Sequence, residues 1–231
     1  MQTLLDALWS AVHLIITLDP NVLEYAGRSL LIAAVSTLVA SLIGIPAGAV
    51  VAACDFPGKR SLVTILNTLL SVPTVVVGLG VYSLINHNGP LGQAQLLFTV
   101  PGIVIGEVLL IVPIVTAFTV TAVARTDRDV RKTALALGAS AGQAHWLVIC
   151  ESRFGVLAAV IAAFGRVVCE VGVAMIVGGN VDHFTRTLTT AIVLNVDMGD
   201  FALALALGLV LLAISLGINV LFQCVQGGGS Q

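Results

Sequence analysis

Three ionisable residues lie inside long apolar stretches of the sequence. Glu107 lies in the run from Leu96 to Val123, and Arg166 and Glu170 lie in the run from Phe154 to Gly179. An ionised side chain at membrane depth costs about 2.5 to 3.5 kcal/mol on insertion scales, so such residues usually have a partner or line a pathway. Two carboxylates and a guanidinium could form a buried ion pair. Alternatively, the guanidinium could supply the positive field that a dehydrated divalent anion needs, with Glu170 keeping the site from trapping it.

Helix geometry places these three residues at a similar depth. At about 1.5 Å per residue, Arg166 lies roughly 20 Å along its stretch from Arg153. Glu107 lies roughly 10 Å from Val100 in a stretch that runs the opposite way. In an apolar layer about 30 Å thick these positions coincide. We therefore expect Arg166 to have Glu170 one turn away on its own helix and Glu107 across a helix interface.

A second group of residues lies where the same apolar stretch ends, in the sequence VGGNVDHFTR that finishes at Arg186. Gly178, Gly179 and Asn180 are expected to end the helix, and backbone amides freed by glycine could point at an anion, to which Arg186 adds positive charge. An ordinary helix stop followed by a turn is the simpler interpretation. A contact surface for a partner protein on the outer side of the membrane is the more specific one.

Long membrane helices are needed to position these groups. Of the 231 residues 58% are hydrophobic and the mean hydropathy is +1.08, which is more apolar surface than a soluble core of this size can bury. The apolar runs are continuous rather than alternating and reach the roughly 20 residues of a helical span, so helices are favoured over a β-barrel. We predict an all-α integral membrane protein with a single transmembrane domain over residues 1–226. Its five spans are Ser29–Cys54, Ser61–Ile85, Leu96–Val123, Phe154–Gly179 and Phe201–Cys224.

The two ends of the chain differ from these spans. Residues 1–27 contain a short apolar run with Asp6 and precede the first basic residue, Arg28, which favours an interfacial helix over a signal peptide or a sixth span. Residues 227–231 resemble an artificial linker. Lys and Arg concentrate in the loops after the first and third spans, which predicts that these loops are cytoplasmic, with the N-terminus outside and the C-terminus inside.

The longest predicted cytoplasmic connection, residues 124–153, carries six charges within Arg125–Lys132. The simpler interpretation is that these charges only set the topology. Asp127 and Asp129 could open a helix that ends at Gly138, and a second short helix is expected from Ser140 to Trp146. The small residues between the two helices would let a groove of another protein dock closely.

The sequence KTALALGASAGQAHWLVICE, from Lys132 to Glu151, resembles the cytoplasmic coupling loop of ABC importer permeases. That pattern is Glu-Ala-Ala, three residues, Gly, nine residues, Ile-x-Leu-Pro. Ala134 and Gly138 match it, and Val148 takes the place of Ile. Lys132 and Thr133 stand where the pattern has Glu and Ala, and Cys150 and Glu151 replace Leu-Pro. The resemblance implies that the ATPase-coupling residues are Lys132, Thr133, Ala134, Leu137, Gly138, Ala139 and Ser140.

Two further stretches, Ser71–Gly92 and Phe164–Asn180, resemble the oxyanion branch of these permeases, which includes molybdate, sulfate and tungstate importers. With TRTLTTAIVLN and ESRFGVLAA the likeness is closest to tungstate permeases. It implies the type I importer permease fold in a bacterial or archaeal cell membrane, pairing with a second copy, an extracytoplasmic binding protein and two ATPase subunits that bind ATP and Mg. This chain has no G-x-x-x-x-G-K-[ST] loop, so we do not expect it to hydrolyse ATP.

Other functions are less well supported by the sequence. A molybdate or sulfate permease stays open, because tungstate and molybdate are both tetrahedral dianions of similar size. A secondary transporter would need an inverted repeat, and five spans do not divide into halves. An intramembrane enzyme would need a nucleophile with a base, or a metal cluster, at membrane depth, and no His or Lys lies within a predicted span. An anion channel remains an alternative. The His and Cys residues are scattered, so we predict no metal site, disulfide or other cofactor. The sequence has no basic stripe that would indicate a nucleic-acid contact.

Overall fold

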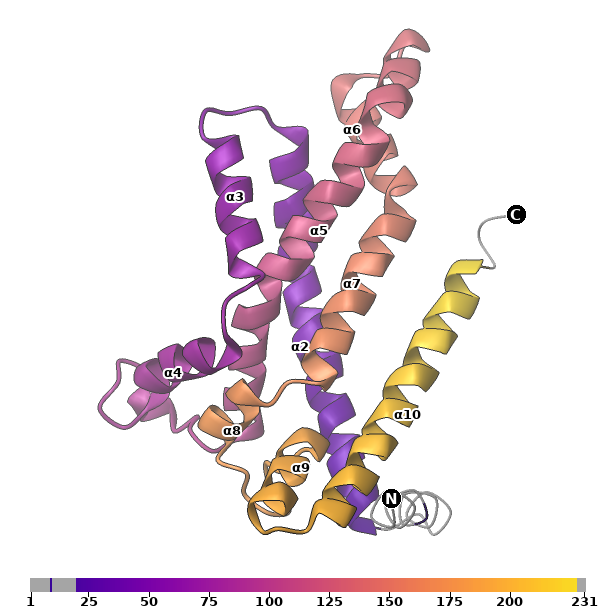
Figure 1. The fold of residues 1–231 in the computed structure, drawn as a ribbon. Coiled ribbons are helices and arrows are strands. Elements are labelled where there is room, and N and C mark those ends of the chain that lie inside the picture. The colour runs from indigo at the N-terminus through magenta and orange to yellow at the C-terminus, as the bar shows by residue number, and fades with distance from the viewer. Residues whose placement is uncertain (1–8, 10–19, 228–231) are drawn as a thin grey trace. The chain divides into compact units, whose positions relative to one another are not determined.

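The fold comes from a computed structural model that describes Trp9 and residues 20–227 (Figure 1). The predicted interfacial helix over residues 1–27 and the predicted linker over 227–231 lie largely outside the described residues. Within the described residues the elements are helical, which confirms the all-α prediction. They are α2 (Pro20–Ala53), α3 (Lys59–Leu69), α4 (Thr74–Ile85), η1 (Gly92–Ala94), α5 (Val100–Ala136), α6 (Ala141–Glu151), α7 (Arg153–Val168), α8 (Gly172–Gly178), α9 (Leu188–Asp197) and α10 (Phe201–Gly227).

Three of the described helices are long and apolar enough to cross a membrane by themselves. They are α2, the part of α5 from Val100 to Thr126, and the part of α10 from Phe201 to Val220. Two bent pairs, α3 with α4 and α6 with α7, bring the number of candidate spans to five if each pair counts as one. The bend is 97° in the first pair and 52° in the second. The described chain therefore has three to five spans, in agreement with a multi-pass membrane protein.

The predicted span Ser61–Ile85 is wrong as a single helix. The chain leaves the helical conformation after Leu70, and Pro73 is extended, with φ −60° and ψ 130°. Proline has no amide to donate to the preceding turn, and it disfavours the α conformation of the residue before it. By contrast, Pro46 and Pro113 lie inside continuous helices.

The predicted span Phe154–Gly179 is also wrong as a single helix, because α7 ends at Val168 and α8 begins at Gly172. Asp127 and Asp129 do not open a new helix, since α5 continues through them to Ala136. A continuous helix satisfies the backbone amides there without new caps.

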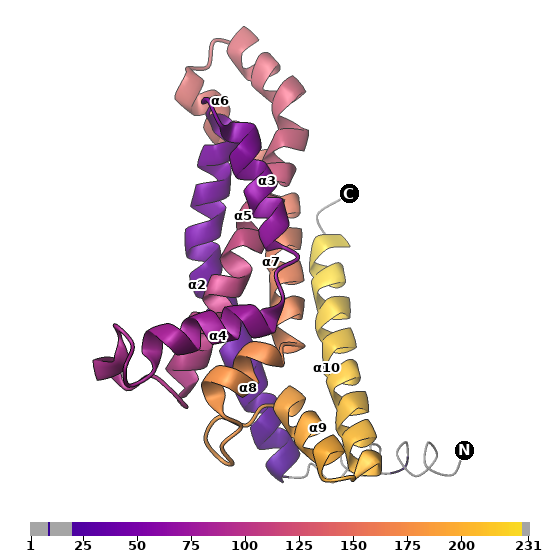
Figure 2. The ribbon, with the colours of Figure 1, turned by 60° about the vertical axis from the view of Figure 1, so that its left-hand side comes forward.

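The described helices form two compact, separate units. The first unit combines Met1–Ser36, Pro73–Glu107 and Gly165–Gln231. In it the start of α2 packs against α9 and α10, and α4 packs against α8 through Val81, Ile85, Val173 and Val177 (Figure 2). The second unit combines Thr37–Val72 and Val108–Phe164. It contains α3, α6, the end of α2, the later part of α5 and most of α7.

In the second unit, α2 and α5 approach closely at two glycines spaced one turn apart. A Cβ atom on Gly44 would lie 2.9 Å from Val115 Cβ, and one on Gly48 would lie 2.7 Å from both the Thr116 carbonyl oxygen and Thr119 Cβ. Small residues allow this contact between membrane helices, where close packing rather than the hydrophobic effect drives association. The glycine spacing therefore fixes the contact between these two helices.

We predict that Gly48→Ala destabilises the protein by about 1 to 3 kcal/mol, because the added methyl group meets a backbone oxygen that cannot move aside. The measurement is the thermal unfolding midpoint of the purified protein in detergent. Gly27→Ala is the matched control on the same helix, since nothing lies within 4 Å of a Cβ there. Equal midpoints for the two variants would show that the α2–α5 contact is looser than described.

Candidate functional site

Arg166 and Glu170 lie on the two sides of the break between α7 and α8. Arg166 is in the last turn of α7, and its Nη1 donates to Glu170 Oε2 at 2.8 Å. The other carboxylate oxygen of Glu170 accepts the amide of Val173, in the first turn of α8, at 3.2 Å. A cation is favourable at the negative, C-terminal end of a helix dipole, and an anion is favourable at the positive, N-terminal end of the next. The predicted Arg166–Glu170 pair is confirmed, although Glu170 lies in the break and not on the same helix.

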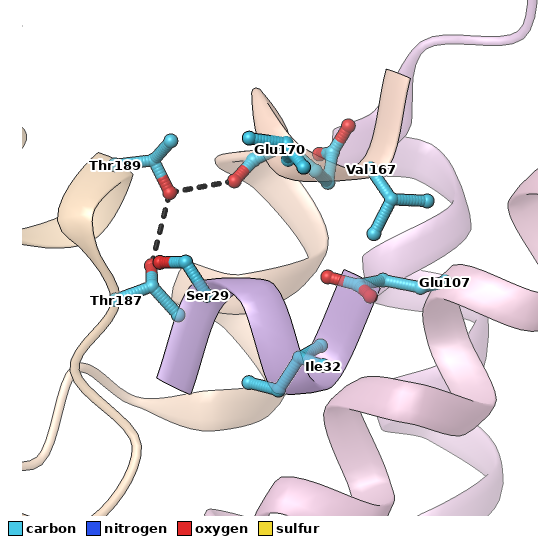
Figure 3. Close-up of a pocket in the computed structure, with 8 residues that line it drawn as sticks. Ser29, Ile32, Glu107, Val167, Glu170, Thr187 and Thr189 are labelled. Carbon is cyan, nitrogen blue, oxygen red and sulfur yellow. Dashed lines mark hydrogen bonds between the residues drawn. The ribbon is translucent and has the colours of Figure 1, made fainter. Parts of the chain in front are cut away.

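Threonines at the start of α9 satisfy the backbone that this break leaves open (Figure 3). Thr189 Oγ1 donates to the carbonyl oxygen of Glu170 at 2.7 Å and lies 2.9 Å from Thr187 Oγ1. A carbonyl without a partner at membrane depth costs several kcal/mol, since lipid offers no donor. The threonine hydroxyl therefore stabilises the interruption of the helix at this position.

A small cavity lies between these groups and α2. Its volume is about 10 Å³, which is about the space that one water molecule needs. Figure 3 shows Glu107 and Glu170 among the side chains around it. The lining residues are Ser29, Ile32, Glu107, Val167, Val168, Glu170, Thr187 and Thr189.

Glu107 is not a partner of Arg166 among the described residues, so the expectation of that second ion pair is wrong. Its carboxylate is only 3% exposed and accepts the hydroxyl of Ser36, on α2, at 2.9 Å. The guanidinium of Arg166 turns instead to Glu170, which is 1% exposed, and the Arg166 side chain stays 40% exposed. The structure thus brings the two carboxylates to one cavity and leaves the cation partly open.

The α8–α9 loop begins with the predicted helix stop. α8 ends at Gly178, and Gly179 and Asn180 both have left-handed backbones, with φ of 67° and 51°. Thr185 Oγ1 donates to the Gly178 carbonyl oxygen at 2.6 Å and accepts the amide of Val181 at 2.9 Å. The Gly178 carbonyl oxygen and the Val181 amide are therefore both hydrogen-bonded to Thr185 within the loop.

Arg186 is held by its own loop and by α2. Its Nη1 lies 2.7 Å from Asp182 Oδ1, its Nε donates to Asn180 Oδ1 at 3.2 Å, and its guanidinium carbon lies 5.7 Å from the ring centre of Tyr25. The side chain is 16% exposed. This geometry fits a structural turn better than a free cation that awaits an anion. A contact with a partner protein stays a prediction.

His183, in the same loop, contacts the start of α2 through Glu24. Its Nδ1 lies 2.9 Å from Glu24 Oε2. The hydrogen bond with Glu24 and the charge of Asp182 together raise the pKa of His183 above its usual value near 6.5. The contact is therefore strongest while the imidazole is protonated.

We predict that the stabilisation from this contact is pH-dependent. It is fully present below the unfolded-state pKa and is lost as pH rises through the raised folded-state pKa. The unfolding midpoint of the wild-type protein should exceed that of His183→Gln at pH 5.5, and the difference should shrink steadily as the pH is raised above neutral. His87→Gln, at an exposed position after α4, is the matched control. A difference that does not change with pH would contradict this assignment.

The predicted coupling residues lie at the turn between α5 and α6. Lys132, Thr133 and Ala134 belong to the last turns of α5. Gly138, the predicted helix stop, has a left-handed backbone with φ 87°. Ser140 caps α6, since its hydroxyl accepts the Gln143 amide at 3.3 Å and Gln143 Oε1 accepts the Ser140 amide at 2.9 Å. The second short helix is therefore confirmed, and it extends beyond Trp146 to Glu151.

Apolar side chains project from this turn. Leu137 is 83% exposed and Trp146 68%, whereas Ala134 is buried against its own unit. Leu135 and Leu147 are also exposed. Exposed leucine and tryptophan this close together mark a surface that another protein or a membrane covers.

Long apolar helices whose ionised groups gather at a helix break define a multi-pass membrane transport component. Residues 28–227 match the family described as the inner membrane component of binding-protein-dependent transport systems. The chain belongs to this family. The predicted resemblance to ABC importer permeases is thereby confirmed, and the chain is a permease without catalytic activity of its own.

Named relatives cover nearly the whole chain. The tungstate uptake system permease protein TupB of Campylobacter jejuni is 38% identical over 95% of this chain and 92% of its own length. The protein of the same name from Peptoclostridium acidaminophilum is 34% identical over 98% of this chain and 99% of its own. A probable anion ABC transporter permease protein of Haloferax volcanii is 36% identical over 84% of this chain and 85% of its own.

Several hydroxyl residues of the site were not predicted from the sequence. Ser29, Ser36, Thr187 and Thr189 are all buried and contact the site or its carboxylates. Single serines in an apolar run carry no signal of their own. The four threonines within residues 185–190 are a signal that could have indicated a polar cluster.

Proposed function

We propose that this chain is the permease subunit of an ATP-driven importer that carries tungstate into the cytoplasm. The observation that carries the proposal is the similarity to two tungstate uptake permeases along more than nine tenths of each chain. Molybdate is the second candidate, because it has the same charge and shape. Sulfate, a smaller tetrahedral dianion, is the third.

In this proposal two copies of the chain enclose the pathway, with the N-terminus outside and the C-terminus in the cytoplasm. A binding protein delivers the anion to the outer side, where the loop with Gly178, Gly179, Asn180 and Arg186 is the proposed contact. Two ATPase subunits bind ATP and Mg and dock on the α5–α6 turn. The exposed apolar side chains of that turn support this role, because such a surface needs a partner.

Arg166 is the proposed positive group along the pathway. Its side chain is 40% exposed while the carboxylate that balances it is buried. A partly exposed guanidinium beside a fixed carboxylate attracts a dianion without holding it tightly, because the net local charge stays small. Glu170 holds the cation and the first turn of α8 together.

The test is the ATPase rate of the complex reconstituted in liposomes with its ATPase subunits and binding protein. The binding protein is loaded in turn with tungstate, molybdate or sulfate. We expect tungstate to give the largest stimulation at saturating binding protein. If molybdate or sulfate stimulates more, the substrate assignment changes. If no oxyanion stimulates at all, the importer assignment is wrong.

A further inference from the structure

Helix α3 carries a polar face that nothing in the described chain covers. None of its residues is buried. Leu62, Val63, Leu66 and Leu70 are half-buried on one side. The rest of the helix surface is exposed, with Ile65 at 56% and Leu69 at 38% beside a set of polar residues. We call this set the α3 polar stripe; it consists of Ser61, Thr64, Asn67 and Thr68, together with Ser71 just beyond the end of the helix. These positions are three or four residues apart or belong to adjoining rows, so they share one face of the helix.

The α3 polar stripe runs at the level of a lipid-facing part of α2. α3 folds back beside the last turns of α2, where Lys59 Nζ donates to the Ala52 carbonyl oxygen at 3.0 Å (Figures 1 and 2). A helix of 11 residues spans about 16 Å, which reaches back to about Leu42. Over that length α2 exposes Leu42 at 69% and Val50 at 59%. Side chains of this kind face lipid, so the stripe lies at membrane depth.

Lipid cannot satisfy the groups of the stripe. Thr64 and Thr68 donate to carbonyl oxygens one turn back, at 2.9 Å each. The side chains of Ser61, Asn67 and Ser71 have no hydrogen-bond partner within the described residues. Polar side chains at membrane depth face a protein partner or a water-filled path.

The charge around the stripe identifies the kind of path. Lys59 and Arg60 stand at its start. Lys59 is paired with Asp55, whose Oδ1 lies 3.3 Å from its Nζ, whereas Arg60 has no ion pair among the described residues. The sequence contains no Asp or Glu between Asp55 and Glu107. Hydroxyl and amide donors next to Arg60, with no carboxylate among the residues of the stripe itself, suit an anion better than a cation. A hydroxyl that now donates to a carbonyl gains a stronger, charge-assisted bond when it turns to an anion.

We propose that the α3 polar stripe lines the anion pathway and faces its counterpart on a second copy of this chain across that pathway. The inference rests on the proposed function and adds the residues that the anion passes. The site is incomplete in one chain, because a single stripe leaves the other side of the path open to lipid.

Cysteine labelling of the reconstituted complex tests this inference. In a background with Cys54, Cys150, Cys169 and Cys224 changed to serine that retains uptake, Thr68→Cys is treated with anionic and cationic methanethiosulfonates. Rates are normalised to those of free cysteine. We expect Thr68→Cys to react at least tenfold faster with the anionic reagent than with the cationic one. Leu42→Cys, at the same depth on α2, should stay unreactive.

Two labelling results would overturn the inference. If Thr68→Cys reacts no faster than Leu42→Cys, the stripe faces lipid or a dry contact. If the cationic reagent reacts at least as fast as the anionic one, α3 lies at the membrane surface among anionic headgroups. In either case, stimulation of the wild-type complex by a loaded binding protein would leave the proposed function intact.

Transport provides a second readout at Asn67. Asn67→Asp places a carboxylate on the stripe and should slow anion uptake at least tenfold, whereas Asn67→Gln keeps the amide and should transport within twofold of wild type. Membrane amounts of both variants are compared by antibody. Equal uptake by the two variants at equal amounts would show that no anion passes this face.

Discussion

The double variant Arg166→Gln/Glu170→Gln is expected to reach the membrane in wild-type amounts but to import the proposed substrate, tungstate, at least tenfold more slowly. Glu170 is buried but Arg166 is 40% exposed, so neutralising both partners leaves no buried charge unpaired and should cost little stability. In the variant, the side-chain amide oxygen introduced at position 170 can still accept the hydrogen bond that the Val173 amide donates to Glu170 in the wild type. The positive charge that we propose for the pathway is lost, however, and in that role a dehydrated dianion then finds no counter-charge.

The single variant Glu170→Ala is the contrasting case. It leaves the guanidinium of Arg166 without its partner and the first turn of α8 without an acceptor. Because the Arg166 side chain is 40% exposed, water still solvates much of its charge. The main loss of stability should come from the unpaired Val173 amide, about 1 to 3 kcal/mol, so less folded protein should remain. Uptake of radioactive tungstate per permease molecule, with the amount measured by antibody, separates the two effects.

Wild-type uptake by the double variant would mean that Arg166 only pairs with Glu170 and supplies no field to the anion. Because Glu107 bonds to Ser36 and not to Arg166, exchanging charges between Arg166 and Glu107 would not address this question. The role of the Arg166 charge is therefore tested at its pair with Glu170, which bridges the helix break.

The positions of the membrane helices follow from the sequence because lipid imposes their length and composition. Runs of about 20 apolar residues have no other stable place. The break before Pro73 also has a local cause, since proline cannot donate to the preceding turn. The left-handed Gly138 just after the end of α5 and the cap of α6 at Ser140 were predictable for the same reason: each depends on a residue type with a specific backbone role.

The break between α7 and α8 could not be predicted, because Cys169, Glu170 and Val171 carry no breaking signal. It is held by contacts distant in sequence, such as the bond from Thr189 to the Glu170 carbonyl oxygen. The partner of Glu107 was missed for a similar reason. Ser36 lies 71 residues away in an apolar run, and only the packing of α2 against α5 brings the two together.

Leu137→Asp should abolish both stimulated ATP hydrolysis and anion uptake while leaving the permease folded. Leu137 is 83% exposed and contributes almost nothing to the packing of its own chain. Burying a leucine in a partner's groove is worth about 1.5 to 3 kcal/mol, and an unpaired carboxylate in that groove adds a penalty. Docking should therefore weaken by at least a hundredfold, measured as the ATPase subunit retained by the purified permease.

Two matched variants show whether this effect belongs to the α5–α6 turn. Leu137→Met keeps an apolar side chain and should retain the ATPase subunit. Phe56→Asp removes another exposed apolar side chain, in the turn between α2 and α3, and should also retain it. If Phe56→Asp releases the ATPase and Leu137→Asp does not, the docking surface is the α2–α3 turn. In that case the left-handed Gly138 and the helix-capping Ser140 would serve only to reverse the chain between α5 and α6.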